Sequence, residues 1–299
     1  MPMKTVLIGL GDIARHHAPG LRQSPQFSLA AVCDLNPDAP SREVYAHLPF
    51  YTDCREMLAE VRPDLAIIAT PPATHAGLLG ICEKAGVYAL VEKPLAESER
   101  QLLPLLPKLK RNAFSIIYHW MFAQEVLWFL ENVPLKQPQS IRIDIEDPYV
   151  GADGNILPSR IQMGGSWLDS GVNALSLLSL WVDLKQLDRM QIRHRPDEKT
   201  GLPVETDAVF AIGPTKGEIH IRWTTGRNRK QTTVRTDKGL YEIRHTEQAV
   251  YKDGQLVFAD DSMNRLERHY FNFYTRYPAS VIPAETTELI HRILLDHLC

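Results

Sequence analysis

Cysteine is scarce in this chain, and its four cysteines show none of the spacings that bind zinc or build a disulfide framework. No apolar run approaches the roughly 20 residues needed to cross a bilayer. The most apolar stretch, 174–182, is interrupted by serines, and the opening apolar run is short and is soon followed by the charged residues Asp12 and Arg15. That opening run therefore predicts a buried strand rather than a signal peptide. We expect a cytoplasmic protein with no membrane partner.

Excess charge of one sign is also missing. The chain has 33 basic and 36 acidic residues, and the basic ones form no stripe, so nucleic acid is not an expected partner. None of the 11 histidines has the spacing of metal ligands, and we expect no metal. His16 and His17, which are adjacent, are predicted to lie on the surface of the first helix. At 299 residues the chain is long enough for two domains of the usual size, roughly 100 to 150 residues each.

Short β-branched runs alternate with longer amphipathic stretches through the first 120 residues. This rhythm predicts parallel β-α-β units. The predicted strands are 5–8, 29–33, 65–69, 88–91 and 114–118.

A glycine-rich segment, Gly9-Leu10-Gly11-Asp12-Ile13-Ala14, stands between the first predicted strand and its helix. Glycines at a strand–helix turn let backbone N–H groups approach a pyrophosphate, and a small residue such as Ala14 lets the helix pack closely on the strand. The segment predicts a dinucleotide site whose first contacts are Gly9, Gly11, Asp12, Ile13 and Ala14.

Asp34 ends the second predicted strand about 20 residues after the glycines, where a carboxylate can accept hydrogen bonds from the adenosine ribose. The same charge repels the 2′-phosphate of NADP, so NAD is the expected cofactor. Arg42 lies nearby and keeps NADP open as an alternative. A second interpretation makes Asp34 only a helix cap or a turn residue.

Two loops follow the next strands and are predicted to flank the dinucleotide, because ligands collect at the carboxyl ends of parallel strands. A proline after Lys93 restricts the lysine backbone to extended geometry and gives its ammonium group a fixed starting direction. The alternative is a surface lysine before a turn. The loop residues expected to contact the cofactor are Thr70, Pro71, Pro72, His75, Glu92 and Lys93.

From residue 139 onward the pattern changes to alternating strands, such as 140–145 and 217–223, with turns at 237–239 and 252–254. Alternation of this kind is typical of an antiparallel sheet with one solvated face. We therefore expect an α/β protein with a dinucleotide-binding domain in residues 1–119 and a substrate and oligomerisation domain in residues 120–299. An aromatic stripe between Tyr270 and Tyr277 is interpreted as core packing, and the last helix is expected over 285–298.

The motifs together resemble the family that contains glucose-fructose oxidoreductase, inositol dehydrogenase and MocA. The resemblance rests on the glycine-rich segment, on 69–75 (ATPPATH), on Glu92-Lys93-Pro94 and on 164–173 (GGSWLDSGVN). It implies an N-terminal doubly wound Rossmann domain, a C-terminal α/β domain with a large, mostly antiparallel open sheet, and a site between them. It also implies a sugar or polyol substrate, NAD or NADP, and a homodimer or homotetramer.

One position departs from the family pattern, because Asn173 stands where the Asp-x-Gly-x-His motif has histidine. An amide cannot exchange a proton near neutral pH as an imidazole can. One interpretation is lost chemistry. The other is that the chain is similar to the L-arabinose and D-galactose 1-dehydrogenase branch, in which asparagine is expected and which Tyr118-His119-Trp120 and Glu146-Asp147 also resemble. The arginine of that branch is missing, and Met121 stands near its place.

Carried over from the family, Lys93, Asp169 and Asn173 are the candidate catalytic residues. Lys93 is expected to stabilise an alkoxide and to relay its proton. Asp169 is expected to act as the base or to orient Lys93, and Asn173 to bind the reacting hydroxyl. A helix from about Gly165 would place Asp169 and Asn173 on one face. His119 is a further candidate for contact with a sugar hydroxyl. The structural alternatives are a helix-dipole charge for Asp169 and a polar surface position for Asn173.

Three functions compete at this point. The leading one is an NAD-dependent aldose 1-dehydrogenase that forms a lactone. The second is a dehydrogenase or reductase that acts at another carbon of a polyol or keto-sugar. The third is a catalytically silent sensor that binds NAD but has lost turnover with the histidine.

Overall fold

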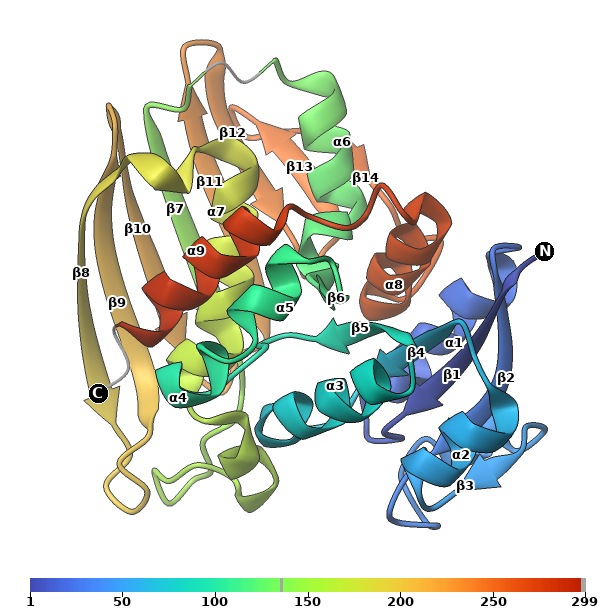
Figure 1. Ribbon diagram of the computed structural model, residues 1–299. Coiled ribbons are helices and arrows are strands. Elements are labelled where there is room, and N and C mark those ends of the chain that lie inside the picture. Colours follow the sequence, from blue (N-terminus) through green and yellow to red (C-terminus); the bar gives the residue numbers. More distant parts are fainter. Residues whose placement is uncertain (135–136, 297–299) are drawn as a thin grey trace. The chain divides into compact units, whose positions relative to one another are not determined.

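The computed structural model describes residues 1–134 and 137–296 (Figure 1). The chain divides into two compact units. The first consists of residues 1–119 and 266–288, and the second of residues 120–265 and the chain from Leu289 onward. Each unit is built on its own sheet, and Cys299 lies outside the described residues.

The sheet of the first unit is parallel throughout, with the strand order β3-β2-β1-β4-β5-β6. This is the order of a dinucleotide-binding Rossmann sheet, and the predicted Rossmann domain is confirmed. Only the two-residue β3 was absent from the prediction, since so short a strand has no pattern of its own. The strands are β1 (Met3–Ile8), β2 (Phe27–Cys33), β3 (Phe50–Tyr51), β4 (Leu65–Ile68), β5 (Tyr88–Glu92) and β6 (Phe114–Ile117).

Helices connect these strands as β-α-β units require. They are α1 (Ala14–Gln23), α2 (Cys54–Val61), α3 (His75–Lys84), α4 (Glu99–Leu102) and α5 (Leu106–Lys110), with short 3-10 turns η1 (Arg42–Tyr45) and η2 (Pro72–Thr74). Helix α8 (Arg265–Arg276) comes from near the end of the chain, and all of it after its first residue belongs to this unit.

Helix α8 packs closely on α1. A Cβ atom at Gly20 would lie 2.7 Å from the Tyr274 ring and 2.8 Å from the Tyr270 carbonyl oxygen, so only glycine fits there. His17, one turn earlier on α1, is fully buried against the same tyrosines. The prediction that His17 lies on the surface is therefore wrong, because the helix that covers it is distant in the sequence.

The eight-stranded sheet of the second unit has the order β14-β13-β12-β11-β7-β10-β9-β8. Within the described residues its only parallel pair is β7 with β10, which confirms the predicted, mostly antiparallel sheet. The strands are β7 (Ser140–Glu146), β8 (Leu187–Pro196), β9 (Pro203–Ile212), β10 (Thr215–Arg222), β11 (Arg229–Thr236), β12 (Gly239–Arg244), β13 (Ala249–Lys252) and β14 (Gln255–Ala259).

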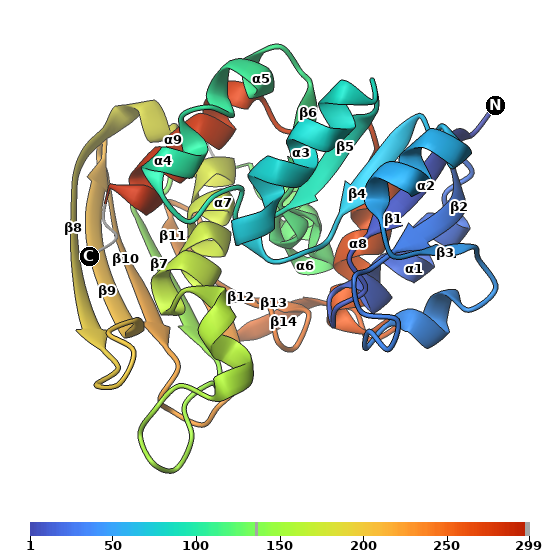
Figure 2. The ribbon, with the colours of Figure 1, turned by 60° about the horizontal axis from the view of Figure 1, so that its bottom comes forward.

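Helices α6 (Gln124–Asn132) and α7 (Val172–Trp181) lie on one face of this sheet in both views (Figures 1 and 2). Alternate residues such as Ile219 and Ile221 are buried on that face. A π-helical turn, η5 (Trp167–Gly171), runs directly into α7. The remaining elements are the 3-10 turns η3 (His119–Phe122), η4 (Pro158–Met163) and η6 (Leu184–Gln186), and α9 (Ala284–Leu295), which begins in the first unit and ends in the second.

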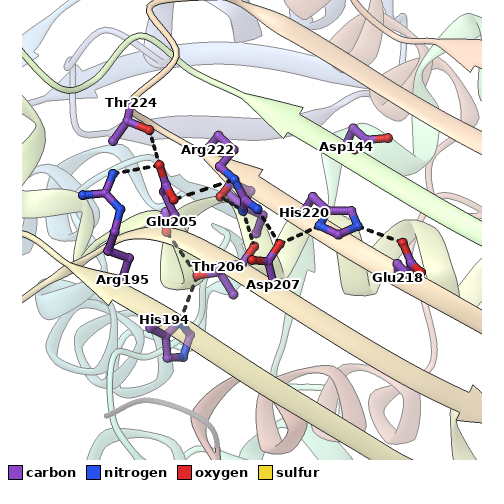
Figure 3. A network of polar contacts seen from close by, with 12 residues as sticks. Asp144, His194, Arg195, Glu205, Thr206, Asp207, Glu218, His220, Arg222 and Thr224 are labelled. Carbon is purple, nitrogen blue, oxygen red and sulfur yellow. Dashed lines mark hydrogen bonds and ion pairs between the residues drawn. The ribbon is translucent and has the colours of Figure 1, made fainter.

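The other face of the same sheet carries a chain of ion pairs that crosses β8, β9, β10 and β7 (Figure 3). Asp207 is its centre, 2.5 Å from both Arg222 and His220. The chain continues through Arg195–Glu205 (2.7 Å), His220–Glu218 (2.9 Å), Arg142–Glu218 (3.5 Å) and Arg142–Asp144 (2.9 Å). A face so rich in paired charge is solvated or faces a polar partner.

The contact between α1 and α8 is tested by Gly20→Ala. The added methyl group collides with α8, so we expect the free energy of unfolding to fall by about 1–3 kcal/mol, as for overpacked sites. The matched control is Gly80→Ala in α3, where a Cβ meets nothing within 4 Å. That change should raise the free energy of unfolding by about 0.5–1 kcal/mol, since alanine is the better helix former. Urea denaturation of both variants measures the difference, and equal stability would contradict the packing described.

Candidate active site

Two loops touch at the carboxyl end of the parallel sheet. Gly9 has φ +96°, and a Cβ there would lie 2.6 Å from both the Ala69 carbonyl oxygen and Thr70 Cγ2. Glycine is required at this position both by its left-handed backbone and by the closeness of the second loop. The glycine-rich segment and the loop after β4 thus form one edge.

Gly11 and the start of α1 leave room for an anion. A Cβ at Gly11 would meet nothing within 4 Å, so the space beside this backbone is open. No side chain caps the N-terminus of α1 at Ile13, and the first turn contains no acidic residue. Ala14 is fully buried, as close helix–strand packing requires. N–H groups at a helix N-terminus that no side chain caps suit a pyrophosphate, so these residues fit a dinucleotide.

Asp12 and Ser41 complete the glycine-rich segment in different ways. Asp12 is exposed and pairs with Arg15 at 3.0 Å. Ser41 is fully buried, and its hydroxyl donates to the Gly11 carbonyl oxygen at 2.6 Å while its N–H donates to Leu10 O at 2.8 Å. Sequence reasoning missed Ser41, because a single serine in a loop gives no signal.

Asp34 ties the end of β2 to the glycine-rich segment. One carboxylate oxygen accepts the Leu10 N–H at 2.6 Å, and the other accepts the Asn36 N–H at 2.8 Å. The turn-residue interpretation is therefore part of its role. Each oxygen keeps a second lone pair, and the side chain is partly exposed, so ribose hydroxyls can still donate to it. Arg42 stacks on the Phe50 ring, 4.7 Å from its centre.

His75 joins the two loops that follow β4 and β5. Its Nε2 is 2.8 Å from the Thr70 carbonyl oxygen and its Nδ1 is 3.0 Å from that of Pro94. The imidazole is fully buried, and this burial lowers its pKa against the smaller opposing effect of the two carbonyls. His75 therefore holds the loops in place. Pro71 and Pro72 lead into η2 beside it, and Thr70 Oγ1 pairs with Thr74 Oγ1 at 2.7 Å.

Glu92 and Lys93 end β5 with different surroundings. Glu92 is 5% exposed and accepts a hydrogen bond from the Tyr270 hydroxyl at 2.7 Å. His17 Nε2 lies 3.2 Å from the same carboxylate, within ion-pair distance although outside hydrogen-bond geometry. Lys93 is only partly buried and directly follows the strand. Successive side chains along a strand point to opposite sides. Glu92 is therefore the buried, hydrogen-bonded residue, and Lys93 beside it is the more accessible one.

His119 ends the first unit and is buried, with 4% of its surface exposed. Its Nδ1 lies 3.1 Å from His269 Nδ1, and its ring stacks on Tyr270 with centroids 5.2 Å apart and planes 18° from parallel. The structure thus brings His119 and Glu92 onto the same tyrosine.

In the second unit, Asp169 lies on the π-helical turn, a feature often found at functional sites. The turn is packed around Trp167, since a Cβ at Gly171 would meet the indole at 2.5 Å. Asn173 follows on α7, and its Nδ2 donates to the Asp169 carbonyl oxygen at 3.3 Å. Asn173 is 6% exposed and so is not a surface residue. Its Oδ1 is buried without a hydrogen-bond partner among the described residues. This orphaned oxygen can accept a hydrogen bond from a hydroxyl group.

A buried ion pair lies close enough to Asp169 for their charges to interact. Lys230, on β11, donates to Asp147 at 2.6 Å, and both side chains are less than 10% exposed. Burial lowers the pKa of Lys230, while the charges of Asp147 and Asp169 oppose that shift. The charges of Asp147 and Asp169 also add to the burial that raises the pKa of Tyr149. Sequence reasoning missed Lys230 and Tyr149, because isolated residues on alternating strands give no sign of pairing.

The first unit therefore combines a fold for dinucleotides with a lysine at the end of β5. The second unit, taken by itself, has a carboxylate, an amide whose Oδ1 lacks a partner among the described residues, and a buried ion pair. Across residues 1–134 and 137–296 no group of three or more His, Cys, Asp or Glu side chains could hold a metal ion. A search of the same residues finds no helix that could span a membrane.

The chain is similar in sequence to proteins of known function. D-glucoside 3-dehydrogenase of Escherichia coli is 28% identical over 184 residues, which are 58% of this chain and 52% of that protein. Myo-inositol 2-dehydrogenase of Thermotoga maritima is 25% identical over 169 residues, 52% of this chain and 50% of that protein. The chain thus matches about half the length of these curated relatives.

The solved structure of UDP-N-acetylglucosamine 3-dehydrogenase from Acidithiobacillus ferrooxidans has the same fold. It superposes with a TM-score of 0.80 over 99% of this chain and 96% of that one, at 16% identity. Residues 3–113 match the model of the GFO_IDH_MocA oxidoreductase family, described as an NAD-binding Rossmann fold. Those residues are therefore similar to the NAD-binding domain of the family that the motifs resemble.

Proposed function

We propose that the protein is an NAD-dependent oxidoreductase that transfers a hydride between a sugar or polyol and nicotinamide. The observation that carries this proposal is the edge of the parallel sheet, where an open glycine backbone and an uncapped helix follow β1 and Lys93 follows β5, with β4 between the two strands. The relatives named above support the substrate class. Residues 1–119 would form the dinucleotide-binding domain, and residues 120–299 the substrate and oligomerisation domain, with α8 returning to the first.

Within this class, an aldose 1-dehydrogenase that forms a lactone is the more specific proposal. It rests on Asn173, because the branch that the motif resembles carries asparagine at this place. The second candidate is a dehydrogenase acting at another carbon. The names of the relatives favour it, since they act at carbon 2 or carbon 3.

The chemistry assigns a role to each candidate. Bound NAD would supply the hydride acceptor. The Lys93 ammonium would stabilise the alkoxide as the hydroxyl loses its proton, and Asp169 would take that proton or orient Lys93. Asn173 would accept a hydrogen bond through its orphaned Oδ1 and so fix the sugar. His119 would contribute through a further hydroxyl contact. The two units must bring these groups together for the reaction to occur.

The cofactor proposal is NAD rather than NADP. Asp34 lies partly exposed at the end of β2, where its charge repels a 2′-phosphate, and Arg42 is stacked on Phe50. A reducing, cytoplasmic location fits the three described cysteines, which are all free.

A silent NAD-binding sensor remains a distinct hypothesis, since Asn173 cannot exchange protons. Against it stand Lys93 and Asp169, which are both present and can perform proton transfer without the histidine. Turnover therefore separates the enzyme from the sensor.

The self-association expected for the chain would use the outward face of the eight-stranded sheet. A hollow of about 600 Å³ lies there, lined by residues such as Val209, Arg142 and Lys216. Its ion pairs would suit the polar contacts of a homodimer or homotetramer.

A panel of pentoses, hexoses and polyols tests the substrate proposal. With NAD present, we expect NADH formation from at least one aldose, and the product should be the lactone. Transfer of deuterium to NAD from a substrate labelled at carbon 1 measures the position of oxidation. Transfer only from carbon 2 or carbon 3 would establish the second candidate, and no turnover with tight NAD binding would support the sensor.

Two substitutions separate chemistry from cofactor binding. Lys93→Met should lower kcat by about two orders of magnitude or more with little change in the Kd of NAD. Asp34→Ala should mainly weaken NAD binding, because it loses the ribose acceptor and the bond to the Leu10 N–H. Steady-state kinetics and NADH fluorescence measure both effects. The reverse pattern would contradict both assignments.

The proposed assembly is tested by Val209→Arg. Val209 lies on β9 in the hollow and is 55% exposed, so an added guanidinium should break an interface there. Light scattering after size exclusion should show a smaller particle than wild type. The control is Val257→Arg on β14, which is 41% exposed and does not line the hollow. A monomeric wild type would refute the assembly.

A further inference from the structure

A buried polar cluster lies between α1, β5 and α8 of the first unit. Its members are His17, Glu92, Tyr270 and Tyr274, and none is more than 5% exposed. They come from three distant segments of the chain. A carboxylate is rarely buried to this extent unless other groups compensate its charge, so the cluster needs an explanation.

The cluster is centred on the Glu92 carboxylate. Tyr270 donates to it at 2.7 Å, and His17 Nε2 lies 3.2 Å from the same oxygen. His17 Nδ1 is in turn 2.6 Å from the Tyr274 hydroxyl, and the His17 ring lies against Tyr270 with centroids 4.1 Å apart. Two side chains, one from each helix, thus contact the carboxylate, and Tyr274 contacts His17.

Tyr270 also reaches the second candidate residue of this unit. The face of its ring stacks on His119, while the neighbouring His269 lies 3.1 Å from His119 Nδ1. A single side chain therefore touches both Glu92, which directly precedes Lys93, and His119. Packing alone does not require a hydroxyl here, since phenylalanine would fill nearly the same space.

The region has little freedom to adjust. Gly20 allows α1 to touch α8 directly, and a Cβ there would meet Tyr274 at 2.7 Å. His75 fixes the other side of the lysine loop through the Pro94 carbonyl oxygen, and the charge of Glu92 acts on it. The groups that face Glu92 are therefore His17, Tyr270, Tyr274 and His75. A shift of Glu92 would be passed to Lys93 through one peptide bond.

We propose that Tyr270 and His17 are positioning residues for the reaction. They hold the Glu92 carboxylate and so the backbone from which Lys93 projects, while the Tyr270 ring and His269 hold His119. The inference rests on the proposed function, because it gives Lys93 and His119 a reaction to serve. It extends that function by making α8 part of the catalytic apparatus.

Tyr270→Phe is the first test, because it removes the hydroxyl and keeps the ring on His119. We expect kcat to fall by about 10- to 100-fold, because a small misplacement of a reacting group lowers the rate by about this factor. The KM for the sugar and the Kd of NADH should stay within about twofold of wild type, since binding groups are not removed. The matched control is Tyr277→Phe, because Tyr277 contacts Phe27 rather than Glu92 and should keep wild-type kinetics.

His17 gives an independent test. His17→Gln keeps a hydrogen-bond donor near Glu92, and His17→Leu does not. We expect the glutamine variant to retain more turnover than the leucine variant, at equal NADH affinity. This pair also decides the inference should Tyr270→Phe fail to fold, as judged by circular dichroism.

A second readout needs no substrate. The acetylation rate of Lys93 by acetic anhydride, followed by peptide mass spectrometry, reports the surroundings of its amine. In Tyr270→Phe and His17→Leu this rate should change relative to wild type, while the exposed Lys84 serves as the internal standard. If no sugar is turned over but the rate changes, the proposed function fails and the positioning role stands. If the rate and the kinetics both match Tyr277→Phe, the positioning role is overturned.

Discussion

The contact between Gly9 and the loop after β4 is the constraint on which the candidate site depends. The Gly9 backbone lies so close to the Ala69 carbonyl oxygen that no Cβ would fit between them, and this contact holds the ends of β1 and β4 together. Near this contact the space beside the Gly11 backbone is open, and no side chain caps the start of α1. Ser41 and Asp34 then secure the segment from outside through hydrogen bonds to its backbone. A dinucleotide would find its donors already in place, so binding would require little ordering.

Buried charge is compensated locally in both units. Glu92 has Tyr270 and His17, Asp147 has Lys230, and Glu125 accepts from His245 at 2.8 Å. Such pairs add little net stability, because desolvation offsets most of the Coulomb attraction. Breaking one is costly, however, so each pair fixes the geometry around it. Two of the three lie beside candidate catalytic residues, which is where geometry has the largest effect on rate.

The exchange of histidine for Asn173 changes how the proposed reaction must handle its proton. Asparagine can bind a hydroxyl through its buried oxygen, but proton transfer is left to Lys93 and Asp169. Lysine would then act both as the cation beside the alkoxide and as a member of the proton path. Accurate placement of this amine is therefore more important here than in a site with a titrating imidazole.

The sequence by itself determined the features that depend on local order. The strands of the parallel sheet, the glycine-rich segment, Asp34 and the two loops with Lys93 follow from short patterns, because each is made by neighbouring residues. The alternation after residue 139 likewise predicted the second sheet. Tertiary structure alone decided what meets across the chain. It buried His17 under α8 and paired Lys230 with Asp147. Such contacts join residues that are far apart in the sequence, and no local pattern of residues predicts them.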